Sequence, residues 1–119
     1  MSEQPEKLRV LFCGAVLQPF FDLPSAEIMD VLKATGKMLR TMRELPGVEV
    51  IGTMDDDETM VGTSPTGFPW TFYILAHVDS RDTVVKACNL FRTSEVGAYR
   101  LWKYMRVEAR IGRELVMPE

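Results

Sequence analysis

The segment at residues 101–113 constrains the fold most, because the character of its side chains alternates along the chain. Every second residue from Leu101 to Ile111 is apolar except Lys103, whereas the residues between them are first aromatic and then charged. The second set comprises Trp102, Tyr104, Arg106, Glu108 and Arg110. Successive side chains of a strand leave a sheet on opposite sides, so this alternation predicts a β-strand. One of its faces should cover a core, and the other must meet water or line a polar cavity.

The size and composition of the chain indicate one globular domain spanning residues 1–119. The chain has 119 residues, of which 46% are hydrophobic and 26% charged, as in an ordinary folded protein with its own core. The net charge of −3 argues against a nucleic-acid partner, which usually requires a basic surface. No apolar run approaches the roughly 20 residues that cross a membrane, so we expect no membrane partner.

The N-terminal tail and the two cysteines predict a cytoplasmic protein. Residues 1–7 are polar and lack the apolar core of a signal peptide. Cys13 and Cys88 lie far apart in apolar segments, which is typical of buried, reduced thiols.

Hydrophobic periodicity predicts the element order β-α-β-β-α-β. The expected strands are residues 8–17, 48–55, 70–79 and 100–113, and a long acidic, Gly- and Pro-rich loop spans residues 56–69. One helix begins near Ser25 and ends at Pro46, and a second is capped by Asp79 or Ser80. In the second strand, Val48, Val50 and Met54 are expected on one face and Ile51 on the other.

This order is that of the ferredoxin-like fold, an α+β architecture with a four-stranded antiparallel sheet and two helices on one face. The opposite face should gather Leu11 and Cys13 from the first strand, Tyr73 and His77 from the third, and the polar side of the last. Such a surface is too apolar for open water and too charged for a dry core. Two such sheets paired face to face would enclose it as a cavity, which predicts a homodimeric α+β barrel.

Over its whole length the chain resembles the dimeric α+β barrel superfamily, which includes cofactor-independent monooxygenases, muconolactone-isomerase-like enzymes and dehydratases. Residues 101–113, LWKYMRVEARIGR, are similar to the small protein found with bacterial indole-3-acetate degradation. The superfamily has no shared catalytic signature, so no catalytic residue is carried over by position. The resemblance implies a homodimer, a cavity between the sheets, and a small aromatic or cyclic acid as ligand.

The polar residues of the expected cavity are candidates for catalysis and binding. His77, the single histidine, is either a general acid or base, because imidazole transfers protons near neutral pH, or a hydrogen-bonded structural residue. Arg106 and Arg110 are candidates to hold a carboxylate, with Glu108 orienting one arginine or acting as a base. The alternative for these three residues is a salt-bridge ladder along the strand.

The aromatic residues of the same face supply flat walls for a ring. Tyr73 and Trp102 are expected to contact the ligand, together with Leu11 and Cys13, and the Tyr104 hydroxyl is a candidate to orient a substrate oxygen.

No metal or organic cofactor is expected. Residues 55–58 are acidic, but Met60 stands where an EF-hand requires glycine, and one histidine cannot form a multi-histidine site. Residues 62–67 are glycine-rich but lack the lysine of a P-loop, and we expect them to close over the cavity.

The sequence therefore predicts a small cofactor-independent enzyme that acts on an aromatic, indole-type acid by oxygenation or proton transfer. The alternative is a non-catalytic ligand-binding or accessory protein of aromatic-acid catabolism. A third reading is a monomer whose open sheet face binds a protein partner.

Overall fold

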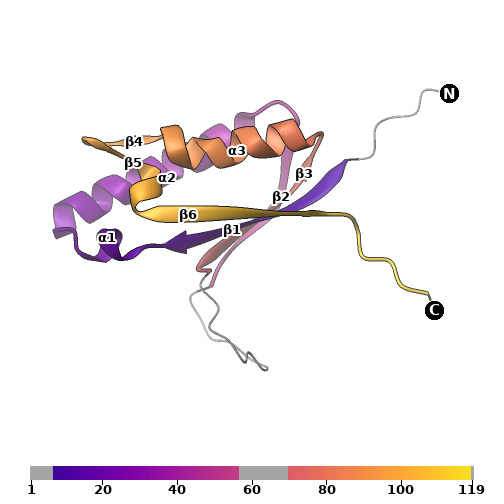
Figure 1. Ribbon diagram of the computed structural model, residues 1–119, viewed down its shortest axis with the longest axis horizontal. Coiled ribbons are helices and arrows are strands. Elements are labelled where there is room, and N and C mark those ends of the chain that lie inside the picture. The colour runs from indigo at the N-terminus through magenta and orange to yellow at the C-terminus, as the bar shows by residue number, and fades with distance from the viewer. Residues whose placement is uncertain (1–6, 57–69, 119) are drawn as a thin grey trace.

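The computed structural model describes residues 7–56 and 70–118 and has the predicted ferredoxin-like architecture (Figure 1). The elements are β1 (Leu8–Val16), α1 (Gln18–Phe21), α2 (Ser25–Glu44), β2 (Val48–Asp55), β3 (Phe72–Val78), α3 (Arg81–Thr93), β4 (Glu95–Val96), β5 (Tyr99–Arg100), the 3₁₀ helix η1 (Leu101–Lys103) and β6 (Met105–Gly112). The four long strands form one antiparallel sheet in the order β2-β3-β1-β6, and α2 and α3 cover one of its faces. Among the described helices, none combines the length and apolar character needed to cross a membrane.

The core lies between the sheet and the two long helices. Alternate residues of β1 and β3 point into it and meet the apolar stripes of both helices; its fully buried members include Val10, Phe12, Ala76, Val78, Val31, Met38, Met42, Ala87 and Phe91. The N-cap of α3 is Ser80, as predicted, because its hydroxyl accepts a hydrogen bond of 3.2 Å from the Thr83 N–H. Such a cap stabilises a helix by about 1 kcal/mol.

At two positions only glycine fits, because side chains from other parts of the chain lie against the backbone there. A Cβ atom on Gly14 would overlap the Phe72 ring, which crosses β1 at that point. Gly47, in the turn before β2, has a φ of +91°, and a Cβ there would overlap the carboxyl group of Asp79. The Asp79 N–H donates to the Gly47 carbonyl at 2.9 Å, so this turn ties β2 to the end of β3.

A β-bulge in β2 corrects the predicted faces of that strand. Val50 is opposite Ala76, but Gly52 is opposite Leu75, so Ile51 is the extra residue. The insertion moves Met54 to the helix-free face, opposite Tyr73, rather than leaving it with Val48 and Val50. The prediction for Met54 was wrong because a two-residue period cannot reveal an inserted residue.

The start of the predicted last strand is also different, because residues 101–103 form the 3₁₀ helix η1 and β6 begins at Met105. Leu101 and Tyr104 are both buried in the core, Tyr104 with 4% of its surface exposed. Residues three apart share a side in a 3₁₀ turn, whereas in a strand they would face opposite ways. Burial of both side chains therefore favours the turn, and the Tyr104 N–H donates to the Leu101 carbonyl at 2.9 Å.

Candidate functional site

The helix-free face of the sheet brings together most of the predicted site residues, but not Trp102 or Tyr104. It carries Leu11, Cys13, Tyr73, His77, Arg106, Glu108 and Arg110, with Cys13 directly between Tyr73 on β3 and Glu108 on β6. Cys13 is only 1% exposed, whereas the three charged side chains of β6 are exposed in the single chain.

Trp102 and Tyr104 lie elsewhere because η1 replaces the start of the predicted strand. Tyr104 is in the hydrophobic core, so it contributes nothing to the helix-free face. Trp102 is 56% exposed, and the guanidinium of Arg92, on α3, lies 5.6 Å from its ring centroid. The sequence prediction that these two rings flank the charged residues of β6 was wrong.

The imidazole of His77 lies between Arg9 and Glu49. Arg9 donates from Nη2 to His77 Nε2 at 3.2 Å, and His77 Nδ1 lies 3.5 Å from Glu49 Oε1. An arginine can only donate, so Nε2 of His77 is the acceptor in this hydrogen bond. Because Arg9 occupies the lone pair of Nε2, His77 accepts a proton there only after Arg9 moves away.

The charged side chains of β6 also have partners within the chain. Arg110 Nη2 lies 2.8 Å from Glu108 Oε2, which is the ion pair along the strand that stood as the alternative to carboxylate binding. The guanidinium of Arg106 lies 5.0 Å from the ring centroid of Trp70. A ligand carboxylate on this face would have to compete with these contacts.

Tyr73 is held at the edge of the same face. Its hydroxyl donates to Asp56 Oδ2 at 3.3 Å, and the pKa of Tyr73 is raised by burial and then by the neighbouring Asp56 carboxylate. The hydroxyl therefore stays protonated at neutral pH and serves as a hydrogen-bond donor. Most of the acidic loop, including the predicted closing segment at 62–67, lies outside the described residues.

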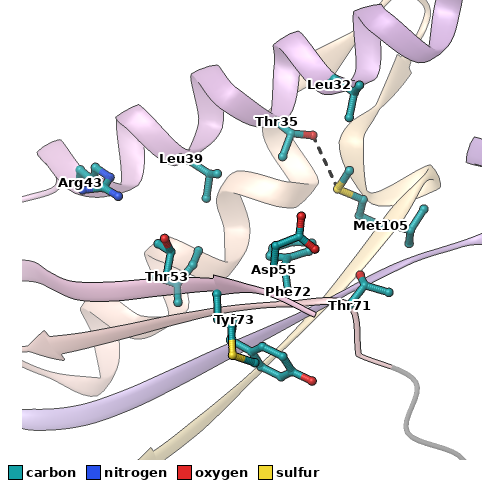
Figure 2. Close-up of a pocket in the computed structure, with 13 residues that line it drawn as sticks. Leu32, Thr35, Leu39, Arg43, Thr53, Asp55, Thr71, Phe72, Tyr73 and Met105 are labelled. Atoms are coloured by element: carbon teal, nitrogen blue, oxygen red, sulfur yellow. Dashed lines mark hydrogen bonds between the residues drawn. The ribbon is translucent and has the colours of Figure 1, made fainter. Parts of the chain in front are cut away.

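A cavity lies on the helix-covered side of the sheet, between α2 and the ends of β2 and β3 (Figure 2). This α2 cleft has a volume of about 420 Å³ and is lined by Val16, Leu32, Thr35, Leu39, Arg43, Thr53, Met54, Asp55, Thr71, Phe72, Tyr73, Ile74 and Met105. Figure 2 shows Leu32, Thr35, Leu39 and Arg43 in succession along the helix, above the side chains of the sheet.

The bulge in β2 determines the polar part of the α2 cleft. After the extra residue, Thr53 and Asp55 are opposite Ile74 and Phe72 and share their helix-facing side. Thr35, on the helix, donates from Oγ1 to the Val31 carbonyl at 2.8 Å and lies 3.6 Å from the Met105 sulfur. The cleft thus combines apolar walls with threonine hydroxyls, one carboxylate and one guanidinium.

Sequence reasoning missed the α2 cleft because the apolar residues of α2 that recur every three or four positions, among them Leu32 and Leu39, are those expected to pack in the core. Leu32 is 48% exposed, so the stripe is only partly covered by the sheet. Two signals in the sequence pointed to the cleft. Thr35 is a polar residue among these apolar positions, and Arg43 shares a helix face with Leu39 because the two are four residues apart.

The charged groups in the cleft suit a small organic acid more directly than a metal ion. Within residues 7–56 and 70–118, no three His, Cys, Asp or Glu side chains are grouped as a metal site would require. Arg43 makes no ion pair with another described residue, and its planar guanidinium matches a carboxylate.

Comparison with known proteins supports the fold. No protein-family model matches the sequence, and no curated protein does. Solved structures of chlorite dismutase from Candidatus Nitrospira defluvii are similar in fold. One mutant superimposes with a TM-score of 0.57 at 10% sequence identity, covering 98% of this chain and 46% of that one. The imidazole complex gives a TM-score of 0.55 at 11% identity, covering 95% and 44%. The chain therefore spans less than half the length of these structures, and identity this low shows the fold alone.

Proposed function

We propose that the chain binds a small aromatic carboxylic acid in the α2 cleft. The observation that carries the proposal is the cavity itself, because 420 Å³ lies within the range of about 300–1,000 Å³ typical of small-molecule sites. Apolar walls from Leu32, Leu39 and Phe72 suit a flat ring, and an indole-type acid is the candidate that the resemblance of residues 101–113 suggests.

Two charged side chains have distinct roles in this proposal. Arg43 binds the carboxylate of the ligand from the end of α2, where a charge-assisted hydrogen bond contributes about 1.5–3 kcal/mol. Asp55 faces the ring from β2 and accepts a proton if the protein catalyses proton transfer or oxygenation of a deprotonated ring. His77 lies on the opposite face of the sheet, so it has no part in chemistry within the α2 cleft.

Titration calorimetry with indole-3-acetate, phenylacetate and neutral indole tests the binding site. Arg43→Gln should weaken binding of both acids at least about tenfold without changing the affinity for indole. Arg40→Gln is the matched control, because Arg40 is on α2 but does not line the cleft. Leu32→Trp should block all three ligands, whereas Met29→Trp, outside the lining, should not. Equal affinities for acids and indole in the unmutated protein would contradict a carboxylate site.

A turnover assay separates an enzyme from a binding protein. If the chain is catalytic, Asp55→Asn should abolish product formation while binding is retained. Absence of turnover in the unmutated protein with every acid that binds would favour the alternative, a non-catalytic ligand-binding or accessory protein.

The second candidate site is a cavity between the helix-free faces of two copies, in a cytoplasmic homodimer. It is favoured by the burial of Cys13 under a charged surface, and Arg106 would then hold the carboxylate while His77 transfers a proton. In that case Arg106→Gln would reduce affinity for the acids, His77→Ala would reduce turnover, and Leu32→Trp would have no effect. Crystals soaked with the same acids would show directly which of the two spaces is occupied.

A further inference from the structure

The strand β6 presents an edge suited to pairing with another strand. It lies at one end of the sheet order β2-β3-β1-β6, so within the described residues its outer edge has no neighbouring strand. Its pairing with β1 runs without a shift from Met105 to Gly112, so the edge is regular over eight residues. Natural sheets commonly blunt such an edge with a bulge, a proline, charged side chains or a cover. The strand β6 has no bulge and no proline, and its charged residues, Arg106, Glu108 and Arg110, are of both signs.

Geometry restricts how two copies of β6 can pair about a twofold axis normal to the sheet. In an antiparallel pair, residues directly opposite each other point to the same face of the sheet. Each residue keeps its face in both copies, so opposite residues must belong to the same alternating set. The axis therefore passes beside a single residue of β6 rather than between two.

The charges of the helix-free face exclude an axis at Glu108, and the extent of overlap then favours Ala109 over Val107. An axis at Glu108 would place Glu108 opposite itself and Arg106 opposite Arg110, which juxtaposes like charges. An axis at Ala109 places Glu108 opposite Arg110 on both sides of the axis. An axis at Val107 also places opposite charges together. It pairs fewer residues of β6, however, because the end of each strand then extends beyond the start of the other.

The apolar side of β6 agrees with the same register. With the axis at Ala109, Val107 is opposite Ile111, whose side chain is exposed in the single chain. Beyond β6 the chain leaves the sheet as an extended C-terminal segment (Figure 1), in which Leu115, Val116 and Met117 are all exposed, Leu115 to 78%. The register directs this segment toward η1 of the other copy, where Trp102 is exposed.

We propose that two copies of the chain associate through their β6 edges, antiparallel and centred on Ala109, to form one continuous sheet. The occupant of the edge is thus a second copy, identified by charge complementarity of the strand with itself. This edge-paired dimer does not depend on a ligand in the α2 cleft. It also differs from a dimer that encloses the helix-free faces, because it places those faces side by side.

Site-directed cross-linking tests the register. Ala109→Cys should form a covalent dimer with a short thiol-reactive cross-linker, because the two Cβ atoms at the axis lie about 4.5–5.5 Å apart. Ile111→Cys, on the same face of β6, should not cross-link to itself, whereas a mixture of Val107→Cys and Ile111→Cys proteins should. The unmutated chain, with Cys13 and Cys88, gives the background.

Charge reversal gives an independent test by sedimentation equilibrium. Glu108→Arg or Arg110→Glu alone should raise the dimer dissociation constant at least about tenfold, because each places like charges opposite each other. The double variant Glu108→Arg/Arg110→Glu should restore association. A monomer at tens of micromolar concentration would overturn the proposal. So would a dimer that ignores both reversals and does not cross-link at position 109.

Discussion

The two edge strands of the sheet, β2 and β6, have the same length and opposite designs. Each has eight residues, but β2 contains the bulge at Ile51, whereas β6 pairs with β1 without interruption. The bulge turns Thr53 and Asp55 toward α2 and gives the cleft its polar groups. The comparison teaches that one extra residue interrupts the edge of β2, whereas its absence leaves the edge of β6 regular.

The two helices reinforce this difference. α2 packs beside β2 and leaves space at its end for the cleft, while α3 packs beside β6 and η1. Ligand binding and self-association are therefore assigned to opposite edges, so changes at one should leave the other intact.

Deletion of Ile51 is the strongest way to break the comparison. Without the extra residue, β2 becomes regular while residues 52–55 keep their partners on β3, so Thr53 and Asp55 stay on the helix-facing side. We expect the straightened edge of β2 to add a second surface for self-association, measured by sedimentation equilibrium, while binding of aromatic acids, measured by calorimetry, changes less than about threefold.

The control for this deletion is Ile51→Ala, which keeps the chain length and the bulge. Ile51 is 47% exposed, so its truncation should cost less than about 1 kcal/mol and leave binding unchanged. If the deletion variant associated no more than Ile51→Ala, the bulge would not be what protects the edge of β2.

Gly47→Ala sharpens the comparison at the start of β2. The substitution combines a strained positive φ with overlap on Asp79, so we expect a loss of about 1–3 kcal/mol in urea unfolding. Gly97→Ala is the matched control, because Gly97 also has a positive φ, +57°, but open space around its Cβ position. Equal losses at the two positions would show that the contact with Asp79 does not matter.

Arg110→Gln should have the smallest effect on the folded chain. Its ion pair with Glu108 is exposed, so its loss should cost under about 1 kcal/mol and even less at high salt. Thermal unfolding at submicromolar concentration, where the chain is expected to be monomeric, measures this contribution. A loss of more than about 2 kcal/mol would mean that β6 depends on the pair for its own folding.

The sequence predicted the element order and the faces of the central strands because their periodicities are long and uninterrupted. Residues 8–16 and 72–78 alternate or are wholly apolar, and Ser80 is a strong capping residue in front of a helical stripe. These local signals agree with the packing of the sheet, so the ferredoxin-like fold followed from them.

The site was harder to predict, because it depends on departures from regular structure. In β2, the glycine at position 52 was the one local hint of a bulge. Before β6, the alternation through Trp102 and Tyr104 fits a strand, and only the burial of both Leu101 and Tyr104 shows that the chain turns there. The volume under α2 depends on the spacing of helix and sheet, which no residue pattern encodes. Whether His77, Arg106 and Arg110 act on a ligand stays a prediction.

The two tryptophans lie in different surroundings, and both are close to residues at or next to β6. Trp70 precedes β3, next to Thr71 in the cleft lining, while Trp102 lies in η1, just before β6. Each indole has a guanidinium nearby, from Arg106 and Arg92 respectively. Because Arg106 belongs to β6, the fluorescence of Trp70 is expected to respond to changes at β6 as well as at the cleft, and replacing either tryptophan by phenylalanine isolates the signal of the other.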